Sequence, residues 1–259
     1  MNVRTIAIMN NKGGVGKTVT SINLADILVR DHHKKVVVVD CDGQANLTRF
    51  FLTVVDNANP DSWVTTADVL TGECEPVWSD NLIPIRDGLE ILPSSSGLYD
   101  LDLQAIKDGA SAPENMKHFA LAAREDDETD FMIFDCPPGY TVASVAALLA
   151  ADEVVIPVTA DAFSIDGVGA VLRQVRTIRR TRPGLTATAL LTQVHSADVV
   201  TEGEKLLRNM GVSVFETRIR RTDKVPESTM SLTPLAEYSA GSAATRDYRA
   251  WVRELLGEV

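Results

Sequence analysis

The 259-residue sequence lacks several features that mark whole classes of proteins. It has no apolar run of membrane-spanning length and no secretory signal, because the first residues lead directly into a strand pattern. Its three cysteines, Cys41, Cys74 and Cys136, have no C-x-x-C spacing, so we expect neither a disulfide framework nor a zinc site. Repeats, low-complexity segments and Pro/Gly linkers are also missing. These absences predict a cytoplasmic protein with reduced thiols, forming a single domain over residues 1–259.

Basic residues are outnumbered, with 25 Lys and Arg against 36 Asp and Glu and a net charge of −11. This balance argues against a protein that coats nucleic acid with its whole surface, but it leaves room for a local basic face. One such face is predicted on a helix that carries Arg173, Arg176 and Arg180, within the acid-free segment 167–197. A second basic cluster contains Arg218, Arg220, Arg221 and Lys224. The alternative interpretation is an ordinary solvated helix face.

Apolar runs alternate with helical patterns along the chain. Strands are predicted at 4–9, 35–40, 131–135, 153–158, 186–192 and 212–216, with a hairpin in 81–93 around an Asp-Gly turn. Helices are predicted at about 17–31, 113–125, 141–150, 164–180, 199–210 and 242–256. This alternation predicts an α/β fold, a single-domain doubly wound and mostly parallel sheet with helices on both faces.

The first strand pattern leads into the segment Asn11-Lys12-Gly13-Gly14-Val15-Gly16-Lys17-Thr18. The phosphate-loop consensus G-x-x-x-x-G-K-[ST] is met at Gly16, Lys17 and Thr18, whereas Asn11 replaces its first glycine. In such a loop, backbone N–H groups and the following helix N-terminus hold phosphates. We expect Lys17 to bind the β- and γ-phosphates and Thr18 to bind Mg²⁺. The second lysine, Lys12, is then available for another task.

Aspartates follow two of the apolar strand patterns. In a doubly wound sheet, ligands bind at the carboxyl edge of the strands, which is where these side chains are expected. We assign Asp135 to the Mg²⁺ site and Asp42 to the attacking water, because Asp42 lies in the loop just past its strand. Asp40 would support either the metal or the loop. Taken singly, each aspartate is equally typical of a helix cap or a turn.

Segments 12–18, 39–46 and 135–138 together resemble the deviant Walker A family of P-loop NTPases, and within it the ParA/Soj partition ATPases. Softer likenesses lie at 68–73, 91–95 and 219–228. The resemblance implies ATP and Mg²⁺ as cofactors and a catalytic set of Lys12, Lys17 and Asp42. The nucleotide contacts it implies are Asn11, Lys12, Gly13, Gly14, Val15, Gly16, Lys17, Thr18, Val19, Thr192 and Arg221, and the metal-site residues are Thr18, Asp135 and Asp40.

The resemblance also implies a mechanism. Two subunits would close around two ATP molecules, and Lys12 of each would reach the partner's phosphates. The ATP-bound homodimer would bind nonspecific DNA through Arg173, Arg176, Arg180, Arg218, Arg220 and Lys224, and would associate with the nucleoid. A ParB-type centromere-binding protein would stimulate a slow Mg²⁺-dependent hydrolysis and release the dimer. Because the phosphate loop begins at residue 11, we expect no separate N-terminal DNA-reading domain.

The sequence departs from this family in two places. Gly43 stands where the family's Asp-x-Asp-Pro-Gln motif has proline, which loosens the loop that carries Asp42. An arginine that contributes to DNA binding in some relatives has no counterpart in segment 192–197. Two alternatives are therefore kept: a MinD-like positioning ATPase that acts on a scaffold other than DNA, and a P-loop metabolic enzyme such as dethiobiotin synthetase. A membrane-binding MinD-type protein would carry a basic amphipathic C-terminal helix, but this chain ends on an acidic segment.

Overall fold

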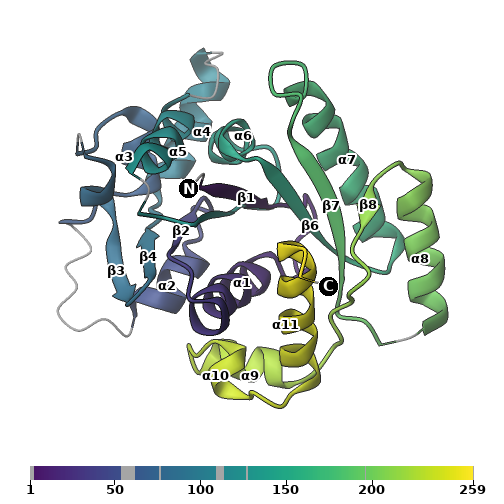
Figure 1. Ribbon diagram of the computed structural model, residues 1–259. Coiled ribbons are helices and arrows are strands. Elements are labelled where there is room, and N and C mark those ends of the chain that lie inside the picture. The colour runs from purple at the N-terminus through teal and green to yellow at the C-terminus, as the bar shows by residue number, and fades with distance from the viewer. Residues whose placement is uncertain are drawn as a thin grey trace.

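The computed structural model describes residues 3–53, 62–75, 77–108, 114–126, 128–195 and 197–258. Residues 113 and 196, which belong to predicted segments, lie outside these ranges. The described chain forms one eight-stranded sheet in the order β3-β4-β2-β5-β1-β6-β7-β8, with helices on both faces (Figure 1). The predicted doubly wound, mostly parallel sheet is therefore confirmed.

The strands of the sheet are parallel except at one edge. The parallel strands are β1 (Arg4–Ile8), β2 (Val36–Asp40), β4 (Leu89–Leu92), β5 (Phe131–Asp135), β6 (Glu153–Thr159), β7 (Thr186–Thr192) and β8 (Ser213–Val214). The edge strand β3 (Ile83–Arg86) is antiparallel to β4 and forms the predicted hairpin with it. The Asp-Gly turn between them places Gly88 at φ 75°, a conformation that glycine adopts without strain.

The register of the central strands brings the candidate site residues to one edge. Asp135 on β5 lies beside Ile8 at the end of β1 and beside Asp40 at the end of β2. The phosphate loop leaves β1, which has β5 on one side and β6 on the other. The carboxyl edge therefore gathers the loop and both acidic strand ends, as expected for an α/β sheet.

The sheet separates two hydrophobic cores, which explains why its strands are apolar on both faces. One face is covered by α1 (Lys17–His32), α2 (Asn46–Leu52), α10 (Leu235–Tyr238) and α11 (Ala243–Leu256). The other face is covered by α3 (Thr66–Thr71), α4 (Gly97–Asp108), α5 (Asn115–Asp126), α6 (Val142–Ala150), α7 (Ala162–Ile178) and α8 (Ala197–Asn209). Alternate strand residues enter opposite cores, Ile6 and Ile8 the first, Ala7 and Met9 the second.

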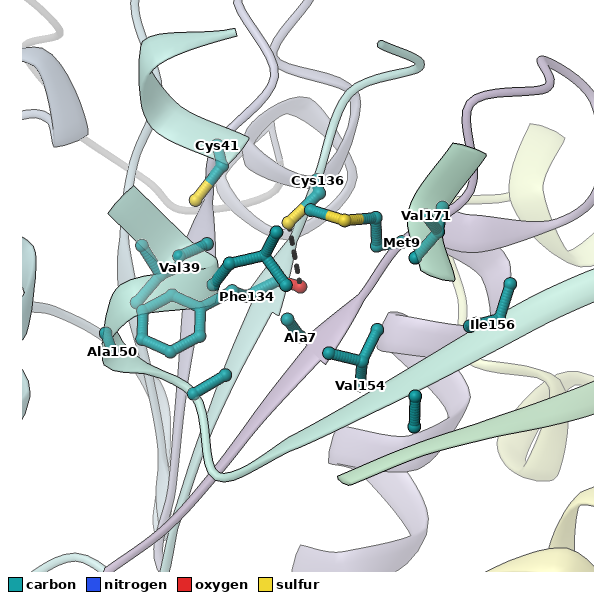
Figure 2. Packing of buried hydrophobic residues seen from close by; sticks show 14 of the residues in the cluster. Ala7, Met9, Val39, Cys41, Phe134, Cys136, Ala150, Val154, Ile156 and Val171 are labelled. Carbon is teal, nitrogen blue, oxygen red and sulfur yellow. Dashed lines mark hydrogen bonds between the residues drawn. The ribbon is translucent and has the colours of Figure 1, made fainter. Parts of the chain in front are cut away.

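Figure 2 shows part of the second core, where Phe134 and Val39 pack near Ala7 and Val154. Cys41 and Cys136, which follow the two acidic strand ends, are buried in the same core as free thiols. A hydrogen bond with Cys136, together with burial, raises the pKa of Cys41 well above its usual value. Because both thiols are buried, they serve as packing residues in this core.

The predicted strands and helices agree with the structure within two residues at each end. Five helices have no counterpart among the predicted helical patterns: α2, α3, α4, α9 (Lys224–Met230) and α10. Four of them have seven residues or fewer, too short for a helical period to emerge. Helix α4 exposes apolar residues such as Leu103 and Ile106, so its apolar positions do not mark a single buried face. No helix in the described ranges is both long and apolar enough to cross a membrane.

Candidate functional site

The phosphate loop joins β1 to α1 and is tied to the sheet at its start. The Asn10 side chain donates to the carbonyl of Pro157 on β6 (2.8 Å) and accepts from the backbone N–H of Lys12 (3.0 Å). Gly14 and Gly16 have φ of 76° and 88°, a region that other residues adopt only with strain. The predicted glycine-rich cradle is therefore present in the backbone.

Strand β7 holds the other side of the loop. The Thr192 hydroxyl, which is buried, donates to the carbonyl of Val15 (2.8 Å), and the Gln193 side chain donates to that of Gly14 (2.6 Å). Thr192 was predicted as a nucleotide contact, and the structure gives it the additional task of anchoring the loop. Gln193 was not predicted. The sequence around Gln193 carries no signal for this contact, in which Gln193 adopts a left-handed backbone at φ 54°.

The two lysines of the loop have different surroundings. Lys17 is 8% exposed, and its ammonium donates to the carbonyl of Lys12 (3.0 Å) across the loop. Burial lowers the pKa of Lys17, while the nearby charges of Asp135 and Asp42 oppose this shift. Lys12 is exposed at the rim of the loop. Its charge helps to lower the pKa of Asp161, against partial burial and together with hydrogen bonds from neighbouring hydroxyls.

Asp135 lies beside the first turn of α1. It is 1% exposed and accepts a hydrogen bond from the Ser21 hydroxyl (2.8 Å). Burial and the neighbouring Asp40 raise the pKa of Asp135 to about 7, although hydrogen bonds from Thr18 and Ser21 and the charge of Lys17 oppose the shift. Hydroxyl and carboxylate oxygens are hard donors of the kind Mg²⁺ prefers, so the Thr18 and Asp135 pair fits the predicted metal.

Asp40 is completely buried, and its oxygens are engaged by the loop that follows it. Oδ1 accepts from the N–H of Asp42 (3.1 Å), and Oδ2 accepts from the N–H and hydroxyl of Thr48 (2.8 and 2.7 Å). Burial raises the pKa of Asp40 to about 6 despite these donors. Of the two roles expected for Asp40, these contacts favour support of the loop, because three of its four lone pairs accept from N–H and O–H donors. Its metal role stays a prediction.

Asp42 lies on the loop between β2 and α2. Its Oδ1 accepts from the N–H of Gln44 (2.9 Å), and its carbonyl accepts from the Ser94 hydroxyl (2.7 Å). The carboxylate is partly exposed and close enough to Lys17 for its charge to act on that pKa. The structure therefore brings Asp42 to the same edge as Lys17 and Asp135, while its role toward water stays a prediction.

Two cavities flank the phosphate loop. One, of about 390 Å³, lies between the loop, the end of β7 and α9, and its lining residues include Gly16, Val19, Thr192, Arg221 and Pro226. The other, of about 300 Å³, is lined by residues that include Lys12, Gly13, Asp161 and Arg221. The predicted contacts Val19, Thr192 and Arg221 thus share the first cavity, although Val19 and Thr192 are far apart in the sequence.

Among the described residues, the buried Asn11 Oδ1 has no hydrogen-bond partner.

Helix α7 packs directly on the loop at a glycine. A Cβ added to Gly167 would lie 2.5 Å from Asn10 Oδ1 and 3.5 Å from the Cβ of Lys12. The helix can approach the loop this closely only because residue 167 has no side chain. The sequence gives no local signal for this contact, since a lone glycine in a helical pattern has many explanations.

The predicted basic face is only partly present. Arg173 and Arg176 are exposed on α7, but the helix ends at Ile178, so Arg180 lies in the turn beyond it rather than on the helix. The helix ends two residues before the predicted end at residue 180. Within the described part of the chain, Arg173, Arg176 and Arg180 form no ion pair.

Three of the four cations in the second basic cluster have a carboxylate partner within the chain. Arg218 pairs with Glu204 (2.5 Å), Arg220 with Asp247 (2.6 Å) and Lys224 with Glu227 (2.7 Å). A cation that already has a carboxylate partner offers less to a phosphate, because the pair must be broken first. This cluster is therefore a weaker candidate for DNA contacts than the α7 arginines.

Comparison with known proteins agrees with this geometry. The family model described as AAA domain matches residues 3–187. The chromosome-partitioning ATPase Soj of Thermus thermophilus is 29% identical over 99% of this chain and 97% of its own length. The chromosome partitioning protein ParA of Caulobacter vibrioides is 27% identical over 98% of this chain and 94% of its own.

A solved structure, cobyrinic acid a,c-diamide synthase from Mycobacterium smegmatis with bound ATP analog and magnesium, superposes with a TM-score of 0.77. It is 27% identical and covers 98% of this chain and 94% of that one. The phosphate loop, the paired acidic strand ends and these full-length similarities lead to the same assignment: the chain belongs to the AAA-domain family that the model describes, as a P-loop ATPase of the ParA/Soj type.

Proposed function

We propose that this ATPase is a dimerising switch that partitions DNA. It binds ATP with Mg²⁺, dimerises, binds nonspecific DNA and is released when a ParB-type partner stimulates hydrolysis. The observation that carries the proposal is the difference between the two lysines of one loop. Lys17 is buried and folded over the loop, whereas Lys12 is exposed at its rim. The relatives named as chromosome-partitioning proteins support the choice of DNA as cargo.

The phosphates would occupy the loop, and the base would enter the larger cavity. The N–H groups of the glycine-rich backbone and the Lys17 ammonium would hold the β- and γ-phosphates. Val19, Val225 and Pro226 give the 390 Å³ cavity an apolar wall suited to a purine ring, and Arg221 lies at the same cavity. The related diamide synthase, solved with an ATP analog and magnesium, supports this choice of ligand.

Mg²⁺, when bound, neutralises charge on the phosphate oxygens. Thr18 and Asp135 are the residues that would hold it, because their oxygens meet beside the loop. Asp42 would orient the attacking water, since it is a partly exposed carboxylate at the edge that also carries Lys17. Asp40 would act indirectly by fixing the loop that carries Asp42.

Lys12 would complete the site of a second subunit. An exposed ammonium at the rim of a phosphate loop reaches another copy more readily than its own β- and γ-phosphates, which Lys17 already serves. Charged groups supplied by a second molecule raise hydrolysis rates by about 10³–10⁵ in related nucleotide switches. Coupling of dimerisation to ATP follows, because the negative charge that Lys12 would reach in the second subunit is supplied by the bound triphosphate.

The dimer test compares Lys12→Ala with Lys17→Ala. We expect Lys12→Ala to keep binding of a fluorescent ATP analogue but to lose the ATP-dependent dimer in light scattering, while Lys17→Ala loses nucleotide binding. An unchanged ATP-dependent dimer in Lys12→Ala would remove the proposed role in trans. Asp42→Ala should form the dimer and hydrolyse poorly, and wild-type turnover in that variant would reassign the water-positioning group.

The DNA test measures retention on nonspecific DNA with ATP and with ADP at two salt concentrations. If the protein binds phosphates, the logarithm of the association constant should fall linearly with the logarithm of the salt concentration. The slope should be about −0.9 per phosphate contact. The variant Arg173→Ala/Arg176→Ala should lose retention, whereas Arg246→Ala/Arg253→Ala, two exposed arginines on α11, should keep it. An ATP-bound dimer that does not bind DNA even at low salt would instead favour a positioning ATPase that acts on a different scaffold.

A further inference from the structure

The loop that carries Asp42 is covered by an aromatic ring from α4. A Cβ added to Gly43 would lie 2.8 Å from Cζ of Tyr99 and 3.0 Å from both Cε1 and Cε2. These distances mean that the hydroxyl end of the ring occupies the space that a Cβ at residue 43 would need. A side chain at position 43 therefore requires the ring to move, because real Cβ atoms essentially never approach other heavy atoms this closely.

The ring is tied to the loop by a hydrogen bond as well as by contact. The Gln44 side-chain amide donates to the Tyr99 hydroxyl, and the backbone N–H of Gln44 donates to Asp42. A second tie from the same segment is the Ser94 hydroxyl, which donates to the carbonyl of Asp42. Residues 42–44 are therefore held against the segment that follows β4.

Tyr99 is presented from a fixed backbone. Its N–H donates to the carbonyl of Ser96 (3.0 Å), and the adjacent Leu98 is buried in the core. Tyr99 is 42% exposed and is not among the residues of either hydrophobic core. Core packing alone therefore does not account for the position of this side chain.

Without the ring, Gly43 would make the loop more mobile. Glycine has access to more backbone conformations than any other residue, and a loop that contains it costs more entropy to order. The carboxylate of Asp42 lies one residue away from this hinge. A small displacement of a catalytic group lowers the rate strongly, because catalysis depends on its geometry.

We propose that Tyr99 is a positioning residue for ATP hydrolysis, which holds the Gly43–Gln44 backbone so that Asp42 faces the phosphates, and that residue 43 is glycine in order to admit the ring. The inference rests on the proposed role of Asp42 in hydrolysis. The two are separable, since Asp42→Ala tests that role alone and the variants below test only the clamp.

The experiment measures single-turnover hydrolysis and the dissociation constant of a fluorescent ATP analogue in four variants. We expect Tyr99→Ala to lower the hydrolysis rate about tenfold while nucleotide affinity changes by less than about twofold, since only Asp42 is misplaced. Tyr99→Phe, which keeps the ring and loses the hydrogen bond, should lie between wild type and Tyr99→Ala. Gly43→Ala should also hydrolyse slowly, and Gly43→Ala/Tyr99→Ala should be no slower than Tyr99→Ala, because the collision is removed.

Two controls match the substitutions. Ile106→Ala truncates a more exposed apolar residue on the same helix, and Gly184→Ala adds a Cβ where nothing lies within 4 Å. Both should hydrolyse at the wild-type rate. The proposal is overturned when Tyr99→Ala turns over normally, when it weakens nucleotide binding rather than hydrolysis, or when the rate losses of Tyr99→Ala and Gly43→Ala multiply in the double variant. The two Tyr99 variants decide the matter even where Gly43→Ala does not fold.

Discussion

Replacing Asp135 by asparagine should stabilise the nucleotide-free protein at pH 8 while it abolishes Mg²⁺-dependent hydrolysis. Asp135 is 1% exposed, and burial together with Asp40 raises its pKa to about 7 from the ordinary value of 3.8. In the unfolded chain the same carboxyl ionises near its ordinary pKa. Between about pH 4 and pH 7, the folded state therefore keeps a proton that the unfolded state has released. The free energy of unfolding falls as the pH rises through this range.

The expected magnitude follows from the size of the shift. About three pKa units, at about 1.4 kcal/mol each, correspond to about 4 kcal/mol of destabilisation by the ionised form at pH 8. Asparagine has the same shape, is neutral at every pH, and offers an oxygen to the Ser21 hydroxyl. Burial of its amide offsets part of the gain, so about 2–4 kcal/mol should remain at pH 8 and almost none near pH 4. With a urea slope of about 2–3 kcal/mol/M, the midpoint should shift by about 1 M.

The assay is urea unfolding at pH 4.5, 6 and 8, followed by tryptophan fluorescence, to which the fully buried Trp251 contributes. The difference between Asp135→Asn and wild type should grow with pH, and Asp100→Asn, which changes an exposed carboxylate on α4, should show no such growth. Adding ATP with Mg²⁺ should stabilise the wild type more than Asp135→Asn, because the carboxylate then gains a cation. A difference that is independent of pH, or a wild type that is the more stable at pH 8, would refute the reasoning.

Three further outcomes follow from the same contacts. Thr192→Val removes the hydroxyl that anchors the phosphate loop, and should weaken binding of an ATP analogue by about 1 kcal/mol. An unchanged affinity would argue against the anchor. Gly167→Ala places a Cβ against the Asn10 side chain at the start of the loop, and should lower the free energy of unfolding by about 1–3 kcal/mol in thermal melts. Gly169→Ala should not lower it, because the nearest atom to its Cβ is the flexible end of Met210. Asp40→Ala leaves the buried N–H and hydroxyl of Thr48 without this acceptor, and should lower the free energy of unfolding by about 2–4 kcal/mol in chemical denaturation. A loss below about 1 kcal/mol would show that the loop does not depend on Asp40.

Much of the fold and the core of the site could be predicted because the signals are local. Buried parallel strands are continuous apolar runs, and the turn from β1 to α1 requires glycines at fixed positions, as the positive φ of Gly14 and Gly16 bears out. The acids at the ends of β2 and β5 follow from the same logic, because parallel strands end at one edge of the sheet. Short helices such as α2 and α10 escaped prediction, since they offer too few turns to establish a period.

The sequence by itself determined the alternation of strands and helices, the glycine-rich loop with its two lysines, and the placement of carboxylates at the sheet edge. Only the tertiary structure decided that Asp40 is occupied by its own loop, that Thr192 anchors the phosphate loop 177 residues away, and that Tyr99 covers Gly43. The physical reason is that backbone conformation depends on neighbours along the chain. Hydrogen bonds and close contacts between side chains depend instead on which distant segments the packing of the two cores brings together.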